Sequence, residues 1–149
     1  MNPTPEKTSV MAPFILMLFL YFIVGLFTVI NQQFQVPLKS ALLPHDGNMT
    51  NALVTLLNFS WFLAYPFSEG FATRWVDRLG YRKTSVYSLL IFIAGLGFYE
   101  AAVLLHIYAP SYITIMGNPI FTGFFIFLSG SFVIGMAVTI LQVVTGLYL

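Results

Sequence analysis

Long apolar runs separated by short polar segments make up most of the chain. Four of these runs, at residues 12–36, 52–71, 84–108 and 120–149, reach the roughly 20 residues that a helix needs to cross a bilayer. Membrane-crossing strands would alternate apolar and polar residues over about ten positions, and none of the four runs does so. Because lipid offers no partners to backbone polar groups, each run is predicted to be an α-helix. The expected fold is therefore all-α: an integral membrane helical bundle of four transmembrane helices, forming a single domain over residues 1–149.

The connections between the runs contain helix-breaking residues. The first connection includes Pro37 and Pro44, the second includes Gly80, and the third includes Pro110 and Pro119. Such residues interrupt or end a helix. They support the division into four helices, joined by segments that we expect to be loops.

The composition agrees with a surface that faces lipid. Of the 149 residues, 58% are apolar and only 7% are charged, whereas soluble domains carry about 25% charged residues. Cysteine is absent, and the two histidines, His45 and His106, are far apart in the sequence, so no metal-ligand spacing is present. The net charge is only +1, which gives no basic surface for nucleic acid. No constellation typical of an enzyme is visible, and we expect no enzymatic activity, metal site or cofactor.

The basic residues are distributed unevenly between the connections. The first connection contains only Lys39. The other five of the six basic residues precede the first run or lie in the second connection: Lys7, Arg74, Arg78, Arg82 and Lys83. Because Lys and Arg are enriched in cytoplasmic connections, both termini and the second connection are predicted to be cytoplasmic. We expect a multi-pass protein of the bacterial cytoplasmic membrane.

The second connection has a specific residue order, Asp77-Arg78-Leu79-Gly80-Tyr81-Arg82-Lys83. Gly80 permits a tight turn, and Arg82 and Lys83 can bind anionic lipid headgroups. A basic loop that only sets the topology would not explain this order. It resembles the signature loop of the major facilitator superfamily, which lies between the second and third helices of that family. The resemblance implies a gating loop formed by Asp77, Arg78, Gly80 and Arg82.

Three short motifs resemble the fucose/glucose-galactose permease family within that superfamily. They are Phe19-Leu20-Tyr21 and Asn31-Gln32-Gln33-Phe34-Gln35 in the first run, and Gln142-Val143-Val144 in the fourth. The resemblance implies secondary-active transport of a hexose or deoxyhexose by alternating access, with the sugar, a coupling cation and the bilayer as partners. Proton-coupled members of that family carry a carboxylate in the first and in the fourth helix. Here Gln142 stands where the fourth-helix acid would be.

Polar side chains within the predicted helices are the candidate ligands of a substrate. Amides are costly in hydrocarbon unless they are hydrogen-bonded, so they must face other helices or a wet cavity. Amides also offer donors and acceptors without charge, which suits sugar hydroxyls. We predict a sugar site formed by Asn31, Gln32, Gln35, Asn58, Trp61 and Gln142. The alternatives are hydrogen bonding between helices for the amides and an apolar-interface role for the tryptophan, which could otherwise stack on a pyranose ring.

Glu100 is the only acidic residue deep within a predicted helix. Burying it ionised in a membrane would cost about 2.5–3.5 kcal/mol on the insertion scale, so it either takes part in coupling or pairs with a partner helix. A Gln amide cannot titrate, but its carbonyl oxygen can bind a cation. The amide-rich first and fourth helices therefore favour sodium coupling or facilitated diffusion over proton coupling.

Two interpretations of the whole chain stay open. A major facilitator is built from two six-helix halves, and the fourth run stays apolar up to Leu149 without a polar tail. We therefore expect a truncated chain that corresponds to the N-terminal four helices of a transporter. The alternative is a small four-helix membrane protein that acts by association with other membrane proteins, without transport.

Overall fold

A computed structural model of the chain describes residues 11–33, 35–43, 47–115 and 117–148. Three helices are long and apolar enough to cross a membrane: α1 (Met11–Gln33), α3 (Asn48–Tyr108) and α4 (Thr122–Tyr148). A short helix, α2 (Gln35–Leu42), and two short strands complete the elements described. The described chain is thus predominantly helical, as the apolar runs predict, and has the helices of a membrane protein.

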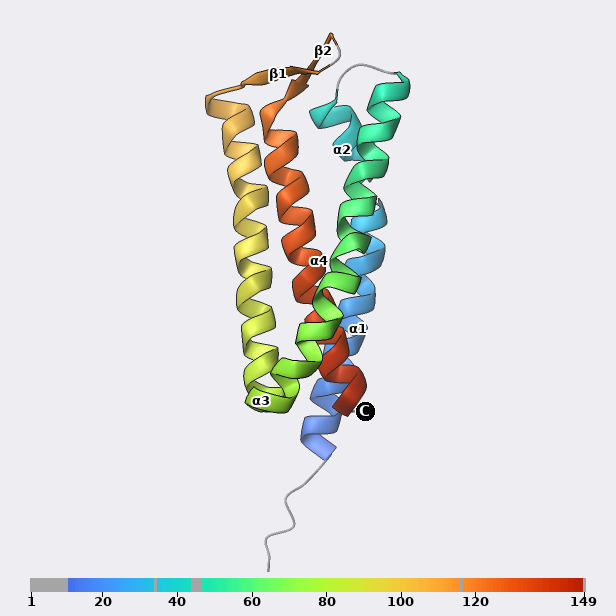
Figure 1. The fold of residues 1–149 in the computed structure, drawn as a ribbon, viewed down its shortest axis with the longest axis vertical. Helices are drawn as coiled ribbons and strands as arrows, with labels where there is room; N and C mark the ends of the chain where they lie inside the picture. Colours follow the sequence, from blue (N-terminus) through green and yellow to red (C-terminus); the bar gives the residue numbers. More distant parts are fainter. Residues whose placement is uncertain (1–10, 34, 44–46, 116, 149) are drawn as a thin grey trace, which may run out of the picture.

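The 61-residue helix α3 reverses its direction at Gly80 (Figure 1). The backbone there has φ 78° and ψ 165°, a region that side-chain-bearing residues avoid and glycine adopts readily. The reversal divides α3 into a first arm, residues 48–79, and a second arm, residues 81–108. The hydroxyl of the fully buried Thr84 donates a hydrogen bond of 3.0 Å to the carbonyl of Gly80, which fixes the start of the second arm. We call this end of the bundle the turn end.

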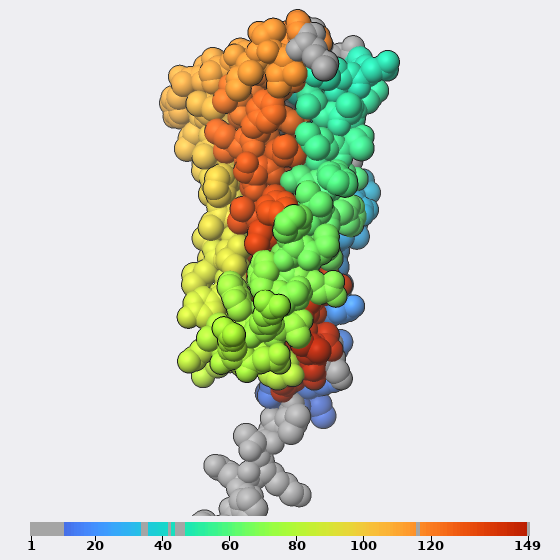
Figure 2. All heavy atoms as spheres, in the orientation of Figure 1, coloured from blue at the N-terminus to red at the C-terminus, as the bar shows by residue number. Residues whose placement is uncertain are grey.

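Helix α4 lies between the two arms of α3 and is the most buried helix of the bundle (Figure 1). Glycines allow the close approach. A Cβ atom at Gly135 would lie 2.7 Å from the carbonyl oxygen of Trp61 on the first arm, and one at Gly95 on the second arm would overlap Ile134 of α4. The Ser60 hydroxyl also donates a hydrogen bond of 3.1 Å to the backbone of α4. Side chains of α4 still reach the surface in the furrow between the arms (Figure 2).

Helix α1 packs mainly along α4 and buries Met17 and Val24 there. It runs from the turn end to the opposite end, where α2 follows (Figure 1). Pro37 lies in the first turn of α2, where its missing N–H is tolerated. Leu43, directly after α2, is buried.

Strands β1 (Tyr112–Ile115) and β2 (Asn118–Phe121) form an antiparallel hairpin between the second arm and α4. Tyr112 pairs with Phe121 at the base of the hairpin, and Gly117 in the turn has φ 81°. We call this end of the bundle the hairpin end. The expectation of plain loops was wrong here and at α2. β-Branched and aromatic residues in Tyr112-Ile113-Thr114-Ile115 favour a strand, but the run is too short to stand out against the apolar helices.

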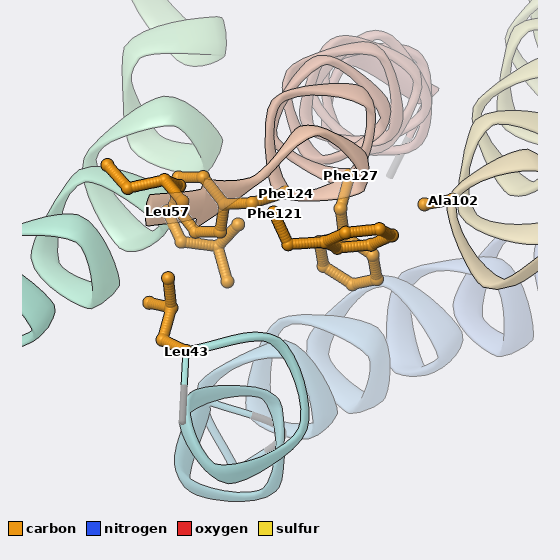
Figure 3. Close-up of a cluster of buried hydrophobic side chains, with 7 residues drawn as sticks. Leu43, Leu57, Ala102, Phe121, Phe124 and Phe127 are labelled. Carbon is orange, nitrogen blue, oxygen red and sulfur yellow. The ribbon is translucent and has the colours of Figure 1, made fainter. Parts of the chain in front are cut away.

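Buried apolar side chains fill the hairpin end of the bundle. They come from the segment after α2, from both arms of α3, from β2 and from α4, so that five parts of the chain converge (Figure 3). The side chains labelled in the close-up are Leu43, Leu57, Ala102, Phe121, Phe124 and Phe127. This hairpin-end cluster ties the short connections to the long helices.

Several of the predicted helix bounds need correction. The predicted bound at residue 36 falls within α2, and α1 is described as far as Gln33. The first arm already begins at Asn48 and not at residue 52. The first arm continues past residue 71, since Val76 is buried against other helices despite its charged neighbours. Helix α4 begins at Thr122 and not at residue 120, because residues 120–121 pair in β2. Leu149, the predicted end, lies outside the described residues.

Candidate functional site

A pocket of about 530 Å³ lies between α1, α4 and the second arm, nearer the hairpin end. We call it the hairpin-side pocket. Its wall is mostly apolar and aromatic, with Phe27 of α1 and Phe92 of the second arm 4.9 Å apart between ring centres. Its other polar or amphipathic wall residues are Asn31, Trp61, Tyr99 and Glu100. Small-molecule sites are usually apolar with a few placed polar groups, which is the composition found here.

Two buried polar atoms on the first arm make no hydrogen bond to any described residue. They are Trp61 Nε1, a donor, and Asn58 Oδ1, an acceptor, one helical turn apart on the first arm. Leaving such groups unbonded costs about 1–3 kcal/mol each. Trp61 is only 2% exposed, so its ring packs within the protein and does not present an open face to a ligand. Its indole N–H is buried as well.

Tyr99 forms part of the pocket wall in a fixed orientation. Its hydroxyl and the hydroxyl of the buried Ser131 on α4 lie 2.8 Å apart and share a hydrogen bond. Its ring stacks on Phe127, with the ring centres 3.9 Å apart and an interplanar angle of 2°. These contacts hold an aromatic face next to Glu100, whose own side chain is exposed. A fixed aromatic wall beside a carboxylate suits a ligand that has both C–H faces and hydroxyl groups.

A second pocket of about 380 Å³ lies nearer the turn end, between α1, the first arm and α4. We call it the turn-side pocket. Gln142 and Thr139 of α4 face Glu69 and Tyr65 of the first arm across it, and Tyr21 of α1 contributes to its wall. These residues come from three separate runs of the sequence, and the pocket forms only when the three helices pack together.

A layer of buried apolar side chains lies at a depth between the two pockets. It consists of Val24, Trp61, Ile134, Val138 and Leu141, all at most 6% exposed. Trp61 and Ile134 line the hairpin-side pocket. Glu69 of the turn-side pocket lies eight positions after Trp61, and Gln142 lies eight positions after Ile134. Eight residues of helix rise about 12 Å, so the apolar layer lies between pockets at two different depths.

The predicted sugar ligands are therefore divided. Asn31 and Trp61 line the hairpin-side pocket, together with Glu100, and Asn58 is one turn from Trp61. Gln142 lies in the turn-side pocket. The Gln32 side chain is exposed and lines neither pocket, and the Gln35 side chain lies outside the described residues.

The side chains of the predicted gating loop lie around the reversal of α3. Asp77, Arg78 and Arg82 are exposed, and Gly80 forms the bend itself. Next to the bend, Tyr81 meets the ring of Tyr148 at the end of α4, with ring centres 5.6 Å apart and near-perpendicular planes. The loop thus connects the two arms and touches α4.

Sequence reasoning missed Tyr99 as a wall residue. Tyr99 directly precedes Glu100, so the acidic residue drew attention to this part of the helix. Tyrosines are common in apolar helices, and the sequence therefore did not distinguish Tyr99. Glu69 and Thr139 become neighbours in one pocket only when the first arm packs on α4. That packing depends on Gly135, where a Cβ atom would meet the backbone of the first arm.

Comparison with family models, with curated proteins and with solved structures finds no match to this chain. Within the described residues, no group of three or more His, Cys, Asp or Glu side chains is placed to hold a metal ion.

Proposed function

We propose that the bundle carries a neutral sugar, a hexose or deoxyhexose, across the bacterial cytoplasmic membrane by alternating access, as in the major facilitator superfamily that its loop resembles. The sugar site is the hairpin-side pocket. The observation that carries this proposal is the mostly aromatic pocket whose wall also holds Asn31, Trp61 and Glu100. The buried atoms Trp61 Nε1 and Asn58 Oδ1 on the first arm lack partners, and a polyhydroxylated ligand would supply both the acceptor and the donor once movement of the arm exposes them.

The pocket walls support a sugar in preference to a purely apolar ligand. Phe27, Phe92 and Tyr99 offer aromatic surface for the C–H faces of a pyranose ring, while Asn31 and Glu100 offer hydrogen-bonding groups at its edge. An apolar ligand would leave these polar groups unbonded, which is unfavourable in a membrane. The volume of about 530 Å³ lies within the usual range for small-molecule sites.

Alternating access needs a barrier between the two faces of the membrane. The apolar layer of Val24, Trp61, Ile134, Val138 and Leu141 supports such a barrier, since hydroxyl groups and ions cross dry apolar layers poorly. Movement of the two arms about Gly80 would open and close it. We propose that Asp77, Arg78 and Arg82, which surround that bend, govern this movement.

The proposed membrane placement has four crossings: α1, each arm of α3, and α4. Because four basic residues lie at or near the turn end, that end is proposed to be cytoplasmic.

In this natively cysteine-free chain, cysteines at the exposed positions Ser40 and Ser111 are expected to react with an impermeant thiol reagent added outside intact cells. A cysteine at the exposed Lys83 is expected to react only after the cells are opened. Thr84 is unsuitable for this test because it is fully buried. If only the cysteine at position 83 reacted in intact cells, the orientation would be the opposite of the proposed one.

If the sugar binds in this pocket, removal of a hydrogen-bonding group from its wall is expected to lower the affinity for hexose. Trp61→Phe keeps an aromatic ring but removes the N–H, and Asn31→Leu removes the amide at similar size. Each variant is expected to weaken hexose binding by about tenfold, the effect of roughly one hydrogen bond. Equilibrium binding of radiolabelled hexoses to the chain in nanodiscs measures this, with Gln33→Leu as the matched change of an exposed amide. Unaltered affinity in both pocket variants, or no hexose binding by the wild type, would refute the site.

One observation favours the alternative of a protein that acts by association. An apolar groove of about 250 Å³ lies between α1, the second arm and α4, and α1 buries only two of its described residues, Met17 and Val24. Such a groove could receive a helix of another membrane protein. Saturable hexose binding by the purified chain separates the two functions, because an association protein has no reason to bind sugar.

A further inference from the structure

The turn-side pocket presents oxygen atoms with free lone pairs. The Thr139 hydroxyl donates its hydrogen to the carbonyl of Gly135 at 2.7 Å, and the Thr73 hydroxyl donates to the carbonyl of Glu69 at 3.1 Å. A hydroxyl that has donated its hydrogen can only accept further bonds or bind a cation. The Glu69 carboxylate, when ionised, is also acceptor-only, and the Gln142 carbonyl oxygen is a further acceptor. The pocket therefore favours a ligand that is positively charged.

The chemistry of these groups narrows the choice of cation. Hard cations such as alkali and alkaline-earth ions prefer carboxylate, carbonyl and hydroxyl oxygen atoms, and the chain has no cysteine to select a soft metal. Glu69 is the one carboxylate of the pocket wall. A single negative charge balances a monovalent ion, whereas sites for divalent ions usually combine several charged ligands.

The position of the pocket also favours a bound cation. Thr139 is buried at 3% exposure, so an ion that reaches it must exchange part of its hydration shell for protein oxygen atoms. The Glu69 side chain is exposed and lines this pocket, so its carboxylate is accessible to an entering cation and attracts it. Across the pocket Thr139 and Gln142 are one helical turn apart on α4 and face Glu69 on the first arm, so an ion there would join the two helices.

We propose that Glu69, Thr139 and Gln142 bind a sodium ion in the turn-side pocket. The binding itself does not depend on sugar, but its role as the coupling ion rests on the proposed function. This inference moves the coupling group from Glu100 to Glu69. Because the ion joins the first arm to α4 on the far side of the apolar layer from the sugar, its presence would stabilise one arrangement of these helices.

Binding of sodium alone to the full chain in nanodiscs tests the proposal. Radioactive sodium is expected to bind saturably, and sodium chloride is expected to raise the unfolding temperature more than potassium or choline chloride at equal ionic strength. Glu69→Gln and Thr139→Val are each expected to weaken sodium binding at least about tenfold. Thr55→Val is the matched control, because the Thr55 hydroxyl makes the same type of bond to its own helix but is exposed outside the pocket.

Three results would overturn the proposal: no saturable sodium binding by the wild type, an equal response to choline, or unchanged binding in both pocket variants. Loss of binding in Glu100→Gln with normal binding in Glu69→Gln would place the ion in the other pocket and also overturn it. Circular dichroism and gel filtration of each variant separate loss of binding from loss of folding. The sodium-binding test contains no sugar, so it is independent of the proposed function. If the chain bound sodium but no hexose, only the sugar site would be refuted.

Discussion

Gly135→Ala is expected to destabilise the bundle by about 1–3 kcal/mol, the usual cost of overpacking a well-packed interior. The new Cβ would lie 2.7 Å from the backbone oxygen of Trp61 and 2.9 Å from the Cβ of Ala64. Neither atom is the end of a flexible side chain, so α4 and the first arm must move apart. The same shift would loosen the apolar layer that Trp61 and Val138 help to form.

The matched control is Gly97→Ala on the second arm, where a Cβ meets no atom within 4 Å. Alanine is better than glycine in a helix interior by roughly 0.5–1 kcal/mol, so this variant is expected to be slightly stabilised. Unfolding of both variants by titration with denaturing detergent, followed by circular dichroism, measures the two free energies of unfolding. Equal stabilisation of both variants would show that α4 does not approach the first arm this closely.

The second large effect is expected at the reversal of α3. Gly80 has φ 78° and ψ 165°, and alanine in such a region costs about 1–3 kcal/mol. No steric contact adds to this cost, because a Cβ at Gly80 meets nothing within 4 Å. Gly80→Ala should therefore destabilise the bundle through backbone strain alone.

The control for Gly80 is Gly70→Ala, which lies within the helical first arm and has open space around its Cβ position. It is expected to gain stability, as alanine usually does in a helix. The free energy of unfolding of each variant, measured as for Gly135, gives the comparison. If Gly80→Ala were as stable as Gly70→Ala, the chain would not need the left-handed conformation at residue 80, and the described bend would be wrong.

The long helices could be predicted because apolar runs carry a strong signal. The bend was also visible, since Gly80 separates two runs within a charged segment. The apolar runs predicted the helix bounds less accurately, because helical packing continues past the end of an apolar run. Val76 is buried between charged residues, which hydropathy alone places in a loop.

The pairing of polar residues could not be predicted, because it depends on which helices touch and at what depth. Asn31 and Gln142 both have amide side chains in apolar helices, but the structure assigns them to different pockets. The division arises because α1 and α4 run in opposite directions, so that Asn31 lies near the hairpin end and Gln142 near the turn end (Figure 1). Glu69 joins Gln142 because the first arm runs in the same direction as α4, so that the later residues of both lie near the turn end (Figure 1).

The central claim is that a sugar binds in the hairpin-side pocket, and photolabelling tests it most directly. The chain in nanodiscs is irradiated with a hexose that carries a small diazirine, and the modified residues are identified by mass spectrometry. Our account predicts labelling in the peptides that contain Asn31, Tyr99 or Glu100, and its suppression by excess unlabelled hexose. Competed labelling around Gln142 and Glu69 instead, or labelling that excess hexose does not reduce, would contradict the account.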